Sequence, residues 1–357
     1  MTPLARLLMR RIALAGPITV AEFMAETLGH PVHGYYQRRD PLGRAGDFIT
    51  APEISQMFGE LIGLWCVEVW HLMGRPDPYR LVELGPGRGT LMSDALRAAR
   101  IRPAFAAAMR LHLVETSPYL RERQAAALSG HHPQWHASFA EVPDGPMLLV
   151  ANEFFDALPV HQFELRPEGW RERVVASEGD SLFFAWTEPG PSFALLSDRQ
   201  RRGPQAEVSP AALGLASEIG RRLARCGGAA LVIDYGPGRS LPGESLQAVR
   251  RHVPVDPLAE PGEADLSAHV DFAALARAAE AAGALAYGPL PQGELLLRLG
   301  LAARAESLLA RATPEQAREI AAARRRLLDA REMGTLFKAL ALTAPGLPIP
   351  PGFAEAR

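Results

Sequence analysis

The residues with the clearest chemistry are three glycines at alternate positions directly after a short apolar run. Residues 81–84 form that run and include Glu83, and Gly85, Gly87 and Gly89 follow, ahead of a helix-like segment. Glycine lets the backbone approach a ligand closely and adopt positive φ. A helix N-terminus adds unpaired N–H donors and a partial positive charge. The strand–turn–helix pattern therefore predicts a site for a nucleotide-like cofactor.

The glycine spacing and the carboxylate distinguish two cofactors. A dinucleotide fingerprint reads G-x-G-x-x-G, whereas the third glycine here comes one residue early. The carboxylate of Glu83 would repel a pyrophosphate and attract a cationic amino group. S-adenosylmethionine has an amino acid head and a sulfonium but no phosphate. The pattern E-x-G-x-G-x-G resembles the first motif of class I methyltransferases.

A second strand, predicted over residues 111–115, ends in another acid. Glu115 is followed by Thr116, Ser117 and Pro118, and Ser-Pro is typical of a helix N-cap with proline at the first helical position. Ligands of open α/β sheets bind at the carboxyl ends of the strands. Glu115 is therefore predicted to accept both hydroxyls of a ribose; the alternative is a solvated acid at a strand end.

A third polar group follows the apolar strand predicted over residues 147–151. Asn152, Glu153 and Asp156 lie there, and a helical turn would place the two acids on one side. Paired carboxylates can hold a guanidinium bidentately and prepare it for attack, since arginine is otherwise a poor nucleophile. The alternative is that Asp156 caps a helix while Glu153 only supports its neighbours.

Three further residues are candidates for the substrate side. Asp234 and Tyr235 end the strand predicted over residues 229–235, and Tyr235 could orient a substrate or form a pocket wall. His269 is a candidate base, although a lone histidine is more often structural.

These residues follow expected strands that alternate with expected helices, and this pattern predicts an α/β fold with a doubly wound sheet. Strands are expected at residues 80–84, 111–115, 147–151 and 229–235, with a short one near 135–136. The expected division is a helical region over residues 1–78, a core over 79–157 and 228–300, an inserted subdomain over 158–227, and a C-terminal helical segment over 301–357 that returns to the core. The insertion is expected to hold antiparallel strands within 160–186 and a helix over 205–225.

Composition excludes several classes of function. The 357 residues are 48% hydrophobic and carry a net charge of −2. This net charge gives no reason to expect binding to nucleic acid or to an anionic membrane. No apolar run reaches membrane-spanning length. Cys66 and Cys226 are isolated, which suits a reducing cytoplasm, and no metal-ligand spacing is present. Residues 1–15 are basic and transit-like, but their apolar spacing favours an amphipathic helix.

Motifs spread along most of the chain resemble the MidA family of methyltransferases, the type that includes mitochondrial complex I assembly factor 7. They comprise residues 46–55, 58–60, 82–90, 114–117, 152–159, 233–236, 264–272, 292–300 and 333–338.

This resemblance implies a class I methyltransferase that uses S-adenosylmethionine and releases S-adenosylhomocysteine. It places the methionine end of the donor on the alternating glycines near Glu83 and the ribose on Glu115, with Thr116 in the same cofactor site. It implies that a loop from Gly46 to Thr50 closes over the donor. The activity it implies is symmetric dimethylation of an arginine on a complex I subunit early in assembly.

Two alternatives remain open. The first is an O-methyltransferase for small carboxylic acids, for which Glu153 and Asp156 would be unfavourable surroundings. The second is an assembly chaperone that keeps the donor pocket without catalysis. We expect a protein substrate, no nucleic acid, no stable membrane insertion and a possible homodimer. The expected location is the cytoplasm of a bacterium, or the mitochondrial matrix if the source is eukaryotic.

Overall fold

The computed structural model describes residues 1–38, 43, 46–47, 49–198 and 200–353, which group into two compact units. The first unit contains residues 1–48, 155–214 and 239–271, and the second contains 49–154, 215–238 and 272–357. This division differs from the expected one. The helices before residue 48 group with the insertion, and so does the segment 239–271, which was expected in the core.

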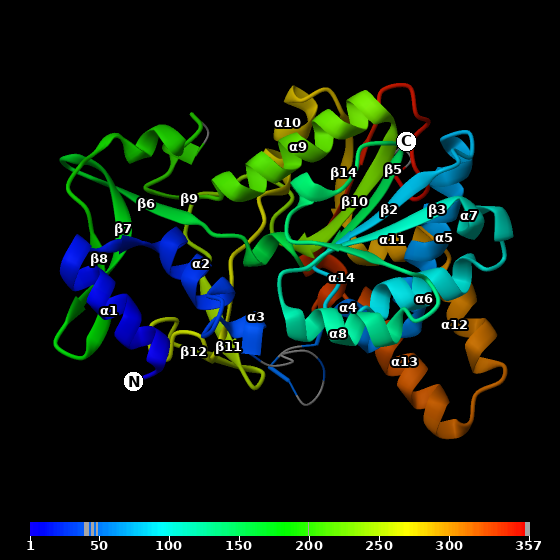
Figure 1. Ribbon diagram of the computed structural model, residues 1–357, viewed down its shortest axis with the longest axis horizontal. Helices are drawn as coiled ribbons and strands as arrows, with labels where there is room; N and C mark the ends of the chain where they lie inside the picture. Colours follow the sequence, from blue (N-terminus) through cyan, green and yellow to red (C-terminus); the bar gives the residue numbers. More distant parts are fainter. Residues whose placement is uncertain (39–42, 44–45, 48, 199, 354–357) are drawn as a thin grey trace. The chain divides into compact units, whose positions relative to one another are not determined.

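The second unit is built on a seven-stranded sheet with the order β14-β15-β10-β5-β2-β3-β4 (Figure 1). Pairing is parallel from β10 to β4, whereas β15 is antiparallel to both β10 and β14. The predicted α/β fold with a doubly wound sheet is thereby confirmed. The strands are β2 (Tyr79–Leu84), β3 (Met109–Val114), β4 (Gln134–His136), β5 (Met147–Asn152), β10 (Gly228–Tyr235), β14 (Leu285–Pro291) and β15 (Phe337–Thr343).

The strand order reverses beside β2. From β2 the chain continues to β3 on one side, and it returns to β5 on the other. All six residues of β5 are buried, as expected of a strand covered on both faces. Ligands of such sheets bind at the carboxyl ends of the strands, at the point where the order reverses. The topology therefore predicts a site where β2 and β5 end.

Helices cover both faces of this sheet. Figure 1 shows α9 (Pro210–Cys226) and α10 (Phe272–Ala281) on one face, and α5 (Gln56–Leu72), α6 (Thr90–Ala99) and α8 (Pro118–Ala127) on the other. The boundary between the units, at residues 214–215, falls inside α9. Helix α6 approaches α5 closely because Gly59 and Gly63 lie one turn apart. A Cβ atom on Gly63 would lie 2.3 Å from the carbonyl oxygen of Ala95. This contact fixes α6, whose first turn follows the glycine loop.

We expect Gly63→Ala to lower the free energy of unfolding by about 1–3 kcal/mol, because the added methyl group must push two helix backbones apart. Gly214→Ala is the matched control, since nothing lies within 4 Å of a Cβ at that helical position. Alanine there should instead stabilise the helix by about 0.5–1 kcal/mol. Denaturant titration of both variants measures the difference, and equal effects would contradict the close-packing argument.

The C-terminal part of the chain is not wholly helical, contrary to expectation. Helices α11 (Gln292–Arg298), α12 (Leu301–Leu309), α13 (Pro314–Leu328) and α14 (Met333–Leu336) are followed by β15, which lies between β10 and β14. Residues 339–342 are alanine and leucine, which are good helix formers, and all four are buried. A short apolar run does not distinguish strand from buried helix, and pairing with β10 decides the outcome.

The first unit combines helices with antiparallel strands. Its larger sheet has the order β1-β7-β6-β9, with β8 pairing β7, and the antiparallel strands predicted within 160–186 are confirmed. The helix expected over 205–225 begins only at Pro210, because residues 205–208 pair with β6 as a strand. The strands of this sheet are β1 (Ile18–Thr19), β6 (His161–Arg166), β7 (Gly169–Glu178), β8 (Ser181–Trp186) and β9 (Gln205–Val208).

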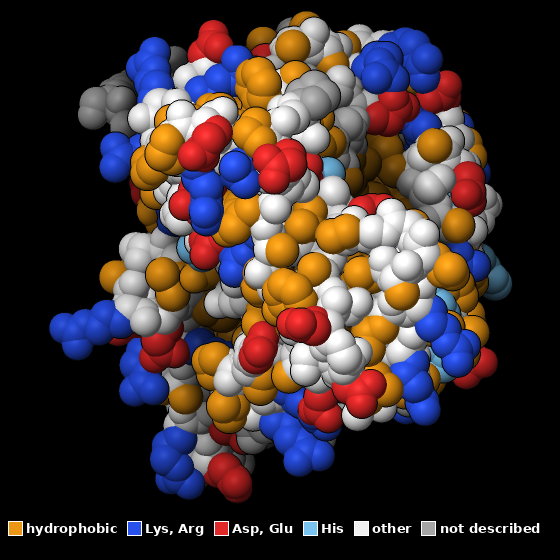
Figure 2. Space-filling view, turned by 90° about the vertical axis from the view of Figure 1, so that its left-hand side faces the viewer, with side chains coloured by type: hydrophobic (Ala, Val, Ile, Leu, Met, Phe, Trp, Pro, Cys, Tyr) orange, Lys and Arg blue, Asp and Glu red, His pale blue; other side chains and the backbone are white. Residues whose placement is uncertain are grey.

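In the part of the chain that the structure describes, the first unit also contains α-helices before residue 39 and a small sheet. The helices are α1 (Pro3–Ala15), α2 (Val20–Gly29) and α3 (Tyr35–Arg38), and the sheet consists of β11 (Gln247–Arg250), β12 (Val253–Val255) and β13 (Asp265–Ser267). Figure 2 shows basic and acidic side chains interspersed on the face it presents, with hydrophobic ones scattered among them. Among the helices that the structure describes, none combines the length and apolarity needed to cross a membrane.

Candidate functional site

The glycine loop after β2 adopts a backbone that requires glycine. Gly85, Gly87 and Gly89 have φ values of 60°, 55° and 82°, and Gly89 is the N-cap of α6. The N–H of Gly85 donates to the carbonyl oxygen of Val114 over 3.0 Å, which ties the loop to the neighbouring strand. A Cβ on Gly85 would lie 2.7 Å from the ring of Phe154. The loop thus presents bare backbone where the topology predicts a ligand.

Two buried acceptors without partners mark the ends of the neighbouring strands β2 and β5. Glu83 is 3% exposed and its Oε2 atom has no hydrogen-bond partner. Asn152 is 9% exposed and its Oδ1 atom also has none. Burial raises the pKa of Glu83 to about 8. Unsatisfied buried acceptors are costly, and an ammonium group could donate to both. These residues fit the amino acid head of S-adenosylmethionine.

Glu115 is held at the end of β3 by several hydrogen bonds. Its Oε1 accepts the N–H of Ser117 over 2.8 Å, and its Oε2 accepts Nε2 of Gln124 over 3.2 Å. Its carbonyl oxygen accepts Nε and Nη2 of Arg121 over 2.8 and 2.5 Å. Burial raises the pKa of Glu115, and these N–H donors oppose the rise. The backbone N–H of Thr116 also bonds to this carboxylate, and since a carboxylate has about four lone-pair sites, it can still accept a hydrogen bond from the ribose diol.

The helix start predicted after Glu115 is confirmed. Ser117 is the N-cap of α8 and its side chain accepts the N–H of Leu120, with Pro118 at the first helical position. Thr116, beside it, is exposed.

Glu53 supports the glycine loop, a role that the sequence pattern did not reveal. It lies in α4 (Ala51–Ile54). Its Oε1 accepts the hydroxyl of Thr90 over 2.5 Å, and its Oε2 accepts Nη1 of Arg88 over 3.1 Å. Glu53 therefore fixes the last part of the loop and the first residue of α6. An acid beside an Ala-Pro helix start gives no hint of this distant partner.

The two ends of the loop predicted to close over the donor lie in different units. Thr50 is the N-cap of α4 in the second unit, although its side chain makes no capping hydrogen bond. Gly46 belongs to the first unit. Phe48, between them, lies outside the described residues. Closure of this loop stays a prediction.

Glu153 follows β5 in a conformation that is rare for its residue type. Its φ is 50°, and its N–H donates to the carbonyl oxygen of Ile233 over 2.9 Å. Its Oε1 accepts the N–H of Ala51 over 2.8 Å and Nδ2 of Asn152 over 3.2 Å. Burial raises its pKa to about 7, with a further contribution from Asp234. A non-glycine residue at positive φ costs about 1–3 kcal/mol and is typical of functional sites.

Asp234 and Tyr235 make contacts within the second unit that favour supporting roles. Asp234 is fully buried, and its two oxygens accept the N–H groups of Phe154 over 3.0 Å and of Tyr235 over 2.8 Å. It thereby holds the backbone that follows Glu153. The ring of Tyr235 lies 5.8 Å from that of Phe337 between centroids. These contacts agree with the alternative in which Tyr235 forms a wall.

Asp156 and His269 belong to the first unit. Glu153 has positive φ and lies outside any helix, whereas Asp156 lies in the short 3-10 helix η2 (Phe155–Ala157). The helical turn that was expected to carry both acids is therefore absent. The N–H of His269 donates to Oγ of Ser245 over 2.7 Å, and burial lowers the pKa of its imidazole.

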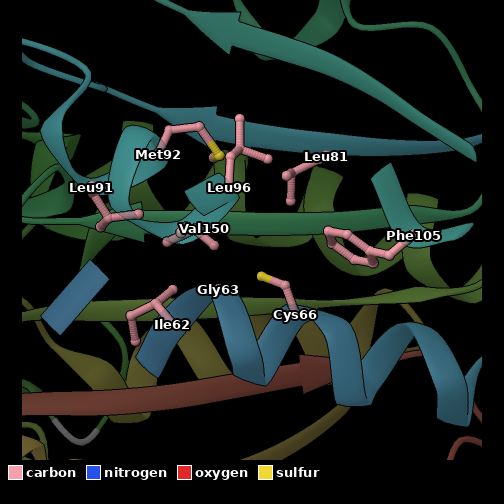
Figure 3. A pocket seen from close by; sticks show the side chains of 10 residues that line it. Ile62, Gly63, Cys66, Leu81, Leu91, Met92, Leu96, Phe105 and Val150 are labelled. Carbon is pink, nitrogen blue, oxygen red and sulfur yellow. The ribbon is translucent and has the colours of Figure 1, made fainter. Parts of the chain in front are cut away.

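A separate cavity lies between the sheet and helices α5 and α6 (Figure 3). Apart from the thiol of Cys66, its lining is apolar, and burial raises the pKa of that thiol to about 12. The amino acid head of a donor would find no partner there, so we assign this cavity to core packing. Across the described parts of the chain, no group of three or more His, Cys, Asp or Glu residues could hold a metal ion.

The sheet, the glycine loop and the acids at the strand ends define a class I S-adenosylmethionine-dependent methyltransferase. Residues 61–290 match the model of a family described as "Putative S-adenosyl-L-methionine-dependent methyltransferase", and the chain belongs to this family. The predicted enzyme class and cofactor are confirmed.

Similar proteins extend the match to nearly the whole chain. It is 39% identical to the Drosophila melanogaster protein arginine methyltransferase NDUFAF7 homolog, mitochondrial, over 95% of this chain and 84% of that one. The human protein arginine methyltransferase NDUFAF7, mitochondrial, is 38% identical over 96% of this chain and 83% of its own. A crystal structure of a likely methyl transferase of the COG1565 superfamily from Burkholderia thailandensis, bound to S-adenosyl-homocysteine, superposes on this chain with a TM-score of 0.84. The two sequences are 28% identical, and the match covers 99% of this chain and 95% of that one.

Proposed function

We propose that this protein is a protein-arginine N-methyltransferase that acts on a subunit of respiratory complex I during assembly. The arginine substrate is supported by the names of the mitochondrial relatives. The complex I target is inferred from the motifs shared with the MidA family. The observation that carries the proposal is Glu153, a partly buried carboxylate held in strained backbone directly after β5.

The second unit supplies the donor site in this proposal. S-adenosylmethionine provides an electrophilic methyl group on a sulfonium. Glu83 and Asn152 receive the ammonium of the donor through their unpartnered oxygens. The glycine loop admits the methionine chain, and Glu115 binds the ribose hydroxyls. The proposed donor position agrees with the rule that ligands of such sheets bind where the strand order reverses.

Glu153 aligns the substrate in this proposal. Its carboxylate is fixed through Oε1 by Ala51 and Asn152, so it can accept N–H bonds from a guanidinium with little loss of freedom. A pKa near 7 also lets it accept the proton that the nitrogen releases on methylation. A carboxylic acid substrate would meet repulsion there, which disfavours the O-methyltransferase alternative.

Labelled methyl transfer tests the proposal. The protein is incubated with S-adenosylmethionine carrying a labelled methyl group, together with isolated complex I subunits or small carboxylic acids. Label on an arginine nitrogen, found by mass spectrometry, is expected. Label on a carboxylate would support the O-methyltransferase instead, and donor binding without any transfer would support the chaperone. The proposal also includes a location in the bacterial cytoplasm, or in the mitochondrial matrix if the source is eukaryotic, which cell fractionation would test. It includes a homodimer as well, which light scattering would test.

Donor binding should strengthen as pH rises toward 8. Glu83 has a pKa of about 8 in the free protein because it is buried, and a bound ammonium would lower that pKa. Binding then releases a proton, so affinity falls by up to about tenfold per pH unit below pH 8. The α-amino group of the donor, which titrates at about 8, limits the gain above that pH.

Calorimetry with S-adenosylhomocysteine between pH 6 and 8 measures this dependence. Glu83→Gln keeps the shape and removes the titration, so its affinity should be weaker and nearly constant with pH. The same slope in the variant and in the wild type would remove Glu83 from the ammonium site.

A further inference from the structure

The side chain of Gln124 joins two parts of the donor site that are far apart in sequence. Gln124 lies in α8 and is fully buried. Its Nε2 donates to the carbonyl oxygen of Gly87 over 2.8 Å and to Oε2 of Glu115 over 3.2 Å. Its Oε1 accepts the indole N–H of Trp135, in β4, over 2.8 Å. All four residues belong to the second unit.

The partners allow the amide only one orientation. The indole nitrogen of Trp135 is only a donor, so it must face the amide oxygen. The carbonyl of Gly87 and the ionised carboxylate of Glu115 are only acceptors, so both must face the amide nitrogen. Rotating the amide by 180° would break all three hydrogen bonds at once. Trp135 therefore orients Gln124, and the amide nitrogen of Gln124 donates both of its hydrogen bonds to the donor site, at Gly87 and Glu115.

From these contacts we infer that Gln124 is a positioning residue that locks the glycine loop to the ribose carboxylate, with Trp135 as its orienting partner. The backbone of α8 adds to this link, since a Cβ on Gly89 would lie 3.4 Å from the Cα of Gln124. The inference rests on the proposed placement of the donor over Gly87 and Glu115. Gln124 acts through those two residues, so its loss should weaken binding of the donor and leave the methyl-transfer step intact.

Three variants test the lock. Gln124→Met keeps the length of the side chain and leaves Gly87, Glu115 and Trp135 without their partner. Trp135→Phe keeps a ring but removes the N–H that orients the amide. Trp70→Phe is the matched control, because the indole of Trp70 is buried and also donates a hydrogen bond, in this case to the backbone carbonyl oxygen of Pro76 over 3.0 Å.

Calorimetry with S-adenosylhomocysteine gives the donor affinity, and labelled methyl transfer gives kcat and the KM for the donor. We expect a loss of affinity of about 10- to 100-fold in Gln124→Met and of about 3- to 10-fold in Trp135→Phe. KM should rise by the same factors, with kcat at saturating donor within about twofold. Trp70→Phe should lower the melting temperature and leave both constants unchanged.

A double-mutant cycle distinguishes this inference from the placement of the donor itself. If Glu115→Gln binds as tightly as the wild type, the placement fails. If it binds more weakly, the placement stands, and Gln124→Met in that background should lose less than in the wild type. Wild-type affinity in both Gln124→Met and Trp135→Phe would overturn the lock. So would a fall in kcat with unchanged KM. If Gln124→Met does not fold, Trp135→Phe decides alone.

Discussion

Glu153→Gln is expected to reduce arginine methylation by about 100-fold or more and to leave donor affinity within about twofold. The glutamine keeps the size of the side chain but carries no charge and accepts no proton, and general-base contributions are typically about 10²–10⁴-fold. Donor binding should persist because the proposed donor contacts lie on Glu83, Asn152 and Glu115. Labelled transfer to an arginine substrate and calorimetry with S-adenosylhomocysteine measure the two quantities.

The pH profile gives a second readout for the same residue. The pKa of Glu153 is raised to about 7 by burial, and the ionised form is the one that binds a guanidinium and accepts its proton. Below pH 7 the rate should therefore fall by up to about tenfold per pH unit, and Glu153→Gln should lack this acidic limb. Glu141→Gln, at an exposed acid bonded to Ala137 and Ser138, serves as the control. Unchanged turnover in Glu153→Gln would exclude the guanidinium role.

The parts of the site that the sequence predicts are those encoded in short segments. Gly85, Gly87 and Gly89 need positive φ, and Ser117 caps the helix that follows Glu115. Both features depend only on residues adjacent in the chain. The strands that carry Glu83 and Glu115 are apolar runs with turn residues at their ends, so the sheet and its binding edge follow from local patterns.

The missing parts depend on contacts across long stretches of chain. Glu53 reaches Arg88 and Thr90 some 35 residues away, and Gln124 joins Gly87 to Trp135. Gln124 lies seven residues, or two helical turns, after Ser117, so both fall on the same face of α8. A polar residue on that buried face was the only feature of the sequence that could have indicated its role. The positive φ of Glu153 is invisible in the sequence, and so is the absence of the helical turn that was expected to carry Glu153 and Asp156.

Glu115→Ala is expected to weaken binding of S-adenosylhomocysteine by about 1–3 kcal/mol, or about 5- to 150-fold. The carboxylate is buried and already oriented by Ser117 and Gln124, so ribose hydroxyls that donate to it form charged hydrogen bonds at little entropic cost. Alanine removes these bonds and leaves the amide of Gln124 with one acceptor. Calorimetry at constant pH measures the change, and an affinity equal to that of the wild type would remove Glu115 from the donor site.

The ligand itself supplies the sharper control for the ribose assignment. Adenosine and 2′,3′-dideoxyadenosine differ only in the hydroxyls that Glu115 is proposed to bind. In competition with S-adenosylhomocysteine, adenosine should bind the wild type more tightly than its dideoxy analogue, and Glu115→Ala should bind both equally, because the partner of the hydroxyls is gone. If Glu115→Ala still binds adenosine more tightly than 2′,3′-dideoxyadenosine, another group must bind the ribose hydroxyls. Loss of the preference would assign the diol to this carboxylate independently of any change in overall affinity or stability.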